Sequence, residues 1–164
     1  MLSVPIAEDN IWALLDEVKD PEIPVVSLVD MGIVREVELE GGKVTVTITP
    51  TFSGCPALRV MEDEVKAKLL EAGCEAVEVK SVLAPPWTSD WITESARKKL
   101  EAYGVTPPQP AADTNLIQLS PPSSRCPRCG SFDTTMTNSF GSTLCKTLHT
   151  CNRCLEPFEA FKTV

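Results

Sequence analysis

The chain has 164 residues, 43% of them hydrophobic, so it is large enough for one or two small soluble domains and too apolar to be disordered as a whole. Its 23 acidic and 15 basic side chains give a net charge of -8, which repels a phosphate backbone and argues against a nucleic-acid-binding protein. Residues up to Asn115 include 20 acidic and 10 basic side chains, whereas those from Leu116 onward include three and five. We therefore expect two parts that differ in kind.

The N-terminus and the cysteine content predict a reducing, cytoplasmic location. The first ten residues have neither the basic segment nor the apolar segment of a signal peptide. No run approaches the roughly 18 apolar residues that span a bilayer. Seven cysteines, an odd number, favour reduced thiols, metal ligation or a reactive thiol over a disulfide framework.

Hydrophobic periodicity predicts the first elements. A helix opens at Glu8, ends at Asp20, and buries one stripe, formed by Ile11, Leu14, Leu15 and Val18. Prolines then hold residues 20–24, DPEIP, in a rigid acidic loop. Strands are expected over 33–39 and 44–48, joined by a glycine hairpin turn. Alternation with threonine predicts one buried face for the second strand.

The following elements complete a first domain. A second helix is expected from about Cys55 to Gly73, a third strand over 76–79, and a third helix over 91–103, capped by Ser89 or Asp90. The core stripe of the second helix is predicted to be Leu58, Met61, Val65 and Leu69. The order α-β-β-α-β-α predicts an α+β fold in which helices cover a small mixed sheet.

Prolines and serines over residues 105–124 predict a semi-rigid spacer. The predicted organisation is therefore a first domain over 1–104, a linker over 105–124 and a small module over 125–164.

Four cysteines of the last segment have metal-ligand spacing. Cys126 and Cys129 form one Cys-x2-Cys pair, Cys151 and Cys154 form another, and 21 residues separate the pairs. Two such pairs hold one tetrahedral ion when a hairpin brings them together, which predicts a zinc ribbon. About 40 residues bury too little apolar surface to fold alone, and a structural zinc ion supplies the missing free energy. Iron in a rubredoxin-like site is the alternative.

Cys145 and His149 lie close to the second pair. Either could replace a ligand. With four cysteines available, we expect Cys145 to be a small buried side chain, and His149 to lie at the surface or beside a ligand.

Cys55 precedes the second predicted helix, where unpaired N–H groups stabilise a thiolate, so it is a candidate reactive or metal-binding thiol. A packing or capping role is the alternative. Asp20, Glu22 and Asp30 could bind a hard metal or act in acid–base chemistry, or could cap turns. The single histidine, and the absence of a phosphate-binding glycine loop, exclude most hydrolase designs.

Two tryptophans, Trp87 and Trp91, follow a pair of prolines. Such side chains are either core residues or a docking surface for a partner, and the sequence leaves both open.

Three segments of the first domain resemble the SufT-like iron–sulfur assembly domain family over about residues 8–104. They are DPEIPVVSLVDMGIV at 20–34, TPTFSGCPA at 49–57 and PPWTSDW at 85–91. With CPRCG at 126–130, FGSTLC at 140–145 and CNRCLEPF at 151–158, the whole chain resembles the D-subunit family of bacterial ring-1,2-phenylacetyl-CoA epoxidases.

The resemblance implies an accessory role in aerobic phenylacetate catabolism, in which the protein helps to mature or insert an iron or iron–sulfur centre. The implied partners are the oxygenase subunits and the iron–sulfur flavin reductase. The family's cysteine falls on Cys55, with Thr51 before it, and its acidic loop on Asp20 and Glu22. Transient iron or a cluster would be held there.

Two other functions stay open. The chain could be a stoichiometric structural subunit of the epoxidase, or an electron carrier if the four cysteines hold iron. We expect a protein that is not itself catalytic, and a homodimer stays open.

Overall fold

The computed structural model describes residues 7–109 and 123–164, which belong to two compact units, Met1–Trp87 and Thr88–Val164. Both units combine helices with a small sheet, so the predicted α+β class is confirmed. None of the helices in the described ranges has the length and apolar character that a membrane span requires.

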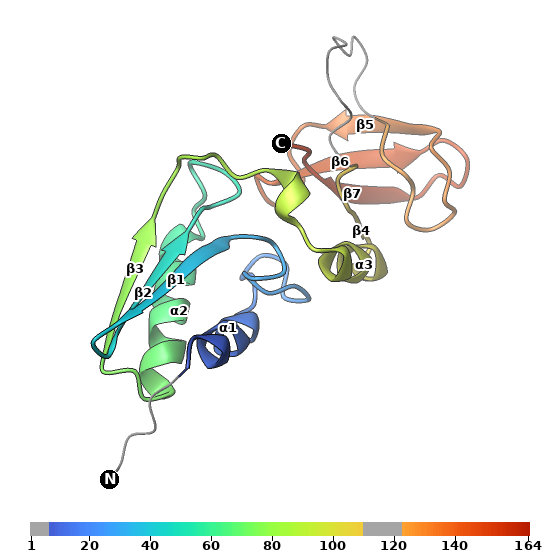
Figure 1. Ribbon diagram of the computed structural model, residues 1–164. Coiled ribbons are helices and arrows are strands. Elements are labelled where there is room, and N and C mark those ends of the chain that lie inside the picture. The colour runs from blue at the N-terminus through green and yellow to red at the C-terminus, as the bar shows by residue number, and fades with distance from the viewer. Residues whose placement is uncertain (1–6, 110–122) are drawn as a thin grey trace. The chain divides into compact units, whose positions relative to one another are not determined.

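The first unit contains two helices and three strands (Figure 1). They are α1 (Glu8–Asp16), β1 (Val34–Glu40), β2 (Lys43–Ile48), α2 (Leu58–Glu71) and β3 (Ala76–Ser81). The sheet has the order β1-β2-β3, with β1 antiparallel and β3 parallel to β2, which is the mixed sheet that the sequence predicts. Gly41 and Gly42 form the β1–β2 turn with φ of 54° and 85°, a conformation that suits glycine.

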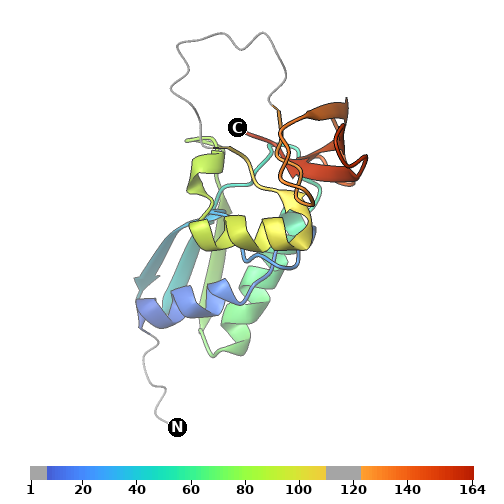
Figure 2. The ribbon, with the colours of Figure 1, turned by 90° about the vertical axis from the view of Figure 1, so that its right-hand side faces the viewer.

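The helices cover the sheet: α1 packs on β1, α2 on β3, and the two helices pack on each other (Figure 2). Apolar side chains at helical spacing enter this core from α1 and α2, where Ile11, Leu15, Met61, Val65 and Leu69 are buried. Burying each of them contributes on the order of 2 kcal/mol. Leu58 is only half-buried, because it is the first residue of α2 and the predicted stripe begins one turn later.

Strand β2 is covered on both faces, contrary to the expected single buried face. Val44, Val46 and Ile48 are buried as predicted, but Thr45 is only 8% exposed. Glu38 of β1 and Glu78 of β3 flank Thr45 in the ladder. A central strand receives the side chains of both neighbours, and the period-two pattern does not reveal that the strand is central.

The second unit contains a short 3₁₀ turn, one helix and a four-stranded sheet. They are η1 (Ser89–Trp91), α3 (Glu94–Tyr103), β4 (Val105–Thr106), β5 (Thr134–Asn138), β6 (Lys146–Cys151) and β7 (Pro157–Phe161). The sheet order is β4-β7-β6-β5. Strands β5, β6 and β7 are antiparallel neighbours, whereas β4 runs parallel to β7.

Helix α3 begins three residues later than predicted. Thr93 is its N-cap and accepts a 3.1 Å hydrogen bond from the N–H of Ala96, whereas Ser89 and Asp90 lie in the preceding 3₁₀ turn. Thr93 was not among the predicted caps, but a threonine at the N-cap satisfies a free helical N–H much as Ser or Asp does.

Residues 105 and 106 form a strand rather than spacer. Val105 and Thr106 are buried, and they pair with Glu159 and Ala160 of β7. Residues 110–122 of the predicted linker lie outside the described residues. The compact units divide after Trp87, so α3 belongs to the second unit, whereas the sequence placed it in the first domain. The linker and the three-part division stay predictions.

Candidate functional site

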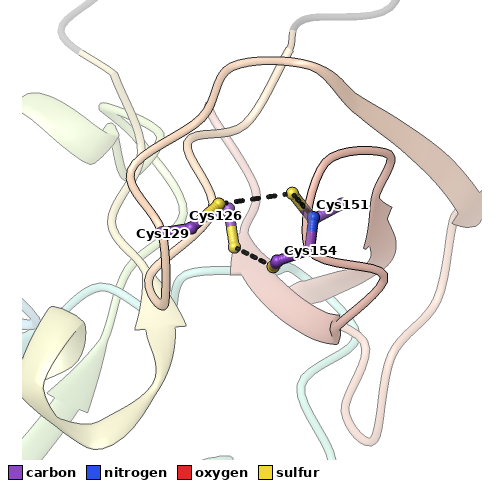
Figure 3. Close-up of side chains that lie close together, drawn as sticks. All are labelled: Cys126, Cys129, Cys151 and Cys154. Atoms are coloured by element: carbon purple, nitrogen blue, oxygen red, sulfur yellow. Dashed lines mark hydrogen bonds between the residues drawn. The ribbon is translucent and has the colours of Figure 1, made fainter.

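Four cysteine thiols of the second unit lie close together (Figure 3). The sulfur atoms of Cys126, Cys129, Cys151 and Cys154 all lie within 4.8 Å of one another. Cys129 and Cys151 Sγ are 3.5 Å apart, and Cys126 and Cys154 Sγ are 3.7 Å apart, so none of them is a disulfide. The β5–β6 hairpin carries the second pair back to the first, as predicted, since Thr134 pairs with Cys151.

Each Cys-x2-Cys pair lies in a turn of the same design. The N–H of Gly130 donates to the C=O of Cys126, and the N–H of Leu155 donates to the C=O of Cys151, both at 2.9 Å. Gly130 and Leu155 both have positive φ, 73° and 63°. Leu155 was not among the predicted residues of the site, and its signal is its position directly after the second pair, equivalent to that of Gly130. A left-handed leucine is strained, and it persists where the surrounding structure fixes it.

Backbone N–H groups and neighbouring thiols shift the pKa values of this group in opposite directions. The N–H of Cys154 donates to Cys151 Sγ at 3.5 Å and, against desolvation, lowers the pKa of Cys151 to about 7. The N–H of Glu156 lowers the pKa of Cys154, but desolvation and the three neighbouring thiols outweigh it and raise that pKa to about 12. Four thiolates this close repel one another, so their joint ionisation requires a cation between them.

The four sulfur positions fit a tetrahedral metal ion. A Zn–S bond of about 2.3 Å places the sulfurs of a tetrahedron roughly 3.8 Å apart, close to the two distances above. Iron bound by four thiolates has a similar shape, so this geometry indicates a metal site without selecting the metal.

Cys145 and His149 stand outside the four-thiol group. Cys145, directly before β6, is half-buried, and its thiol lies 3.1 Å from Thr143 Oγ1. His149 is only 1% exposed, so of its two expected positions the surface is wrong, and the position beside a ligand stays a prediction. The ring stacks on Phe158 at 5.4 Å and its Nε2 lies 2.8 Å from Thr147 Oγ1. Burial lowers the pKa of His149 and favours the neutral ring.

A buried ion pair holds the β5–β6 loop, and the sequence analysis missed it. Lys146 Nζ lies 2.8 Å from Glu159 Oε2, and the side chain of Lys146 is 5% exposed. The N–H and the hydroxyl of Ser142 also donate to Glu159. Burial opposes ionisation, but these donors together lower the pKa of Glu159. The signal available was a lysine and a glutamate in neighbouring strands, which sequence alone cannot align.

We expect Glu159→Gln to lower the free energy of unfolding by about 2 kcal/mol at neutral pH, because Lys146 loses its buried counter-charge. A lowered folded-state pKa stabilises the fold above the ordinary pKa of Glu, about 4.3, and the contribution is lost as pH falls through the folded value. Urea unfolding of both proteins across this pH range tests the prediction. A difference that stays constant at acid pH would contradict it.

The first unit brings Cys55 close to the acidic loop. Cys55 is half-buried in the turn before α2, three residues ahead of the helix. Burial raises the pKa of its thiol, the N–H groups of Ala57 and Leu58 lower it, and the charges of Glu22 and Asp20 raise it again. On balance the pKa of Cys55 is raised, so the metal-free protein does not stabilise the thiolate, contrary to the expectation from the sequence. The helix N–H groups contribute as predicted, but burial and two carboxylates outweigh them.

Asp20 also shapes its own loop. Its Oδ1 accepts hydrogen bonds from the N–H groups of Glu22 and Ile23 at 2.8 and 2.9 Å. Asp30 accepts similarly from the N–H of Ser27. The turn-capping alternative therefore holds for both residues, and Asp20 still lies close enough to Cys55 to act on its charge. Thr51 is half-buried four residues before Cys55, and its role stays a prediction.

Trp87 is a core residue rather than part of a docking surface. Its side chain is only 3% exposed and its indole N–H donates a 2.9 Å hydrogen bond to the C=O of Met31. Trp91 is half-buried in η1, and a docking role for it stays a prediction.

Comparison with known protein families gives two matches along the chain. Residues 8–82 match the iron–sulfur cluster assembly protein family, and residues 111–162 match the family described as the PaaD zinc beta ribbon domain. A solved structure described as a domain of unknown function DUF59 from Bacillus anthracis covers 57% of this chain and 90% of its own, with 30% identity and a TM-score of 0.53.

Two curated relatives are also similar over most of their own length. A protein of Escherichia coli K12 named as the D subunit of 1,2-phenylacetyl-CoA epoxidase is 44% identical over 155 residues, which is 94% of this chain and 92% of the relative. The iron–sulfur protein maturation auxiliary factor YitW of Bacillus subtilis is 37% identical over 55% of this chain and 89% of its own. These similarities confirm the resemblances found in the sequence.

Proposed function

Because the chain belongs to the D-subunit family of 1,2-phenylacetyl-CoA epoxidases, we propose that it helps to mature or insert an iron or iron–sulfur centre in such an epoxidase. The family and the maturation factors among the relatives support an accessory role in the epoxidase system. The proposal adds the task, a cytoplasmic location and two clients, the oxygenase and its reductase.

One observation carries the proposal: Cys55 lies within the electrostatic reach of Asp20 and Glu22. A thiolate with carboxylates is a mixed soft and hard ligand set, which suits iron. The raised pKa keeps the free thiol protonated at neutral pH, so binding a cation must release a proton and acid reverses it. Because the metal must displace this proton and the site is only half-buried, we expect the site to bind a metal transiently rather than permanently.

The four-cysteine group would have a different task. We assign it a structural zinc ion, held by Cys126, Cys129, Cys151 and Cys154. Four protein ligands close the coordination sphere and leave no open position, which is typical of structural zinc. The ion would stabilise the β-sheet module, while the cargo metal passes through the first unit.

The experiment compares the epoxidase purified from cells with and without this chain. We expect epoxidase from cells without it to contain less iron and to lose most of its turnover. Ferrous iron added together with the purified chain should restore both, with inorganic sulfide also supplied where the client centre is an iron–sulfur cluster. Iron content that stays complete without the chain would contradict the proposal. Lost activity with full iron, together with co-elution of the chain in gel filtration, would instead identify a structural subunit.

Metal analysis of the isolated protein tests the zinc assignment. We expect one zinc per chain and no visible colour. A red protein that bleaches reversibly on reduction would overturn the assignment, because four-thiolate iron is a redox-active electron carrier.

A further inference from the structure

Strand β3 ends the sheet of the first unit, since the described strands are ordered β1-β2-β3 and β2 occupies only one edge of β3. Val77, Glu78 and Val79 are half-buried, and Ala76, Lys80 and Ser81 are exposed. Native proteins protect such edges, because unpaired N–H and C=O groups are a template for another strand. A groove of about 490 Å³ lies beside this edge, lined by Val77 and Val79 and by charged residues of α2.

The hydrogen bonds of the ladder identify the groups that point away from β2. The N–H of Val82 donates to the C=O of Ile48 at 2.9 Å, so the even-numbered residues of β3 direct their backbone groups towards β2. Because direction alternates along a strand, the N–H and C=O groups of Val77, Val79 and Ser81 point outward. These three residues are the hydrogen-bonding positions of the edge.

An antiparallel copy of β3 matches this edge in one register. In this register Val79 lies opposite Val79 of the copy, and Val77 lies opposite Ser81. The outward-pointing backbone N–H and C=O groups of each strand then lie opposite those of the other and can form hydrogen bonds. The same register places Glu78 opposite Lys80 twice, in the pairs where side chains come closest. Registers centred on Glu78 or Lys80 place like charges opposite each other. The edge is therefore self-complementary in backbone and in charge.

We propose that β3 is the interface of a homodimer, in which two copies of the first unit join through their β3 strands into one six-stranded sheet. The two-fold axis passes through Val79. Lys43 of the same chain already pairs with Glu78, at 2.5 Å from Oε2. The Glu78 side chain is nevertheless 43% exposed, and a carboxylate has two oxygens, so it can accept the partner's Lys80 as well.

Charge reversals with the full chain test the proposal by sedimentation over a range of protein concentrations. We expect a dimer for the unchanged protein. Glu78→Lys and Lys80→Glu each place like charges opposite each other twice, so each is expected to raise the dimer Kd by about tenfold or more. Mixed together, the two variants restore both opposite-charge pairs, so a heterodimer should form with the original affinity.

Two further measurements separate pairing from misfolding. Glu38→Lys on β1 makes the same change at the other edge of the sheet, and is expected to leave the dimer intact. The amide protons of Val77, Val79 and Ser81 should exchange more slowly as the protein is concentrated. A monomer at every concentration would overturn the proposal, as would a dimer that both single variants retain.

Discussion

Cys126→Ala is expected to unfold the β-sheet module of the second unit. Cys126 is 1% exposed and packs with Cys151, Phe158 and Ala160, in a cluster too small to stabilise four short strands. A structural zinc ion contributes on the order of 10 kcal/mol to such a module, and a site with three thiolates loses much of it. We expect the metal content to fall well below one ion per chain and the amide signals of residues 123–164 to lose their dispersion.

Cys145→Ala is the matched control, because Cys145 is a half-buried cysteine of the same unit outside the four-thiol group. It should retain the metal and the amide dispersion. A Cys126→Ala protein with a full complement of metal and an unchanged melting temperature would show that the fold does not depend on this ligand.

Cys55→Ala is expected to reduce maturation of the epoxidase to the level of cells that lack the chain. Among the cysteines of the first unit, Cys74 is buried, whereas Cys55 is half-buried and lies within the electrostatic reach of Glu22 and Asp20. The substitution removes a half-buried sulfur, so stability should change by about 1 kcal/mol or less. Epoxidase iron content and turnover measure the first effect, and urea unfolding of the isolated chain measures the second.

The serine variant separates ligation from packing. Cys55→Ser keeps a small group that can accept the N–H bonds of Ala57 and Leu58 but removes the soft ligand, so it should fail like alanine. Cys74→Ala removes the other cysteine of the unit and should leave maturation intact. Full maturation with Cys55→Ser would exclude the thiol as a metal ligand.

Thiol alkylation gives a readout without the epoxidase. Burial and the charges of Glu22 and Asp20 raise the pKa of Cys55, so alkylation near pH 7 should be slower than that of an ordinary thiol. Glu22→Gln removes one charge and should accelerate it. An alkylation rate that this substitution leaves unchanged would show that Glu22 lies too far from Cys55 for the two side chains to bind the same metal ion.

The patterns within single elements predicted most of this structure. Cysteine spacing identified the ribbon, because its ligands come from two short turns and one hairpin. Periodicity placed Met61, Val65 and Leu69 in the core. These features depend on residues that are near in sequence, where helix and strand geometry determines which side chains share a face.

The errors arose where distant segments meet. His149 is buried, where one expected position was the surface, and Phe158 of the neighbouring strand stacks on it. For Trp87 the sequence left core and docking surface open, and the structure buries it, with its N–H bonded to Met31. The charge on Cys55 depends on carboxylates more than thirty residues away in sequence. Each outcome requires the register of strands or the path of a loop, and neither is encoded in local pattern.

Strand β4 determines where the β-sheet module of the second unit can be cut from the rest of the chain. The matched ribbon family begins at residue 111, yet β4 at Val105–Thr106 forms an edge of the same sheet, pairing with β7, and Thr106 Oγ1 donates to the C=O of Arg125. A fragment that starts at residue 111 leaves one side of β7 open and exposes Phe158, Ala160 and Phe161 nearby. In this chain a segment from beyond the family boundary therefore completes the sheet of the ribbon, and a fragment cut to isolate the module should include β4.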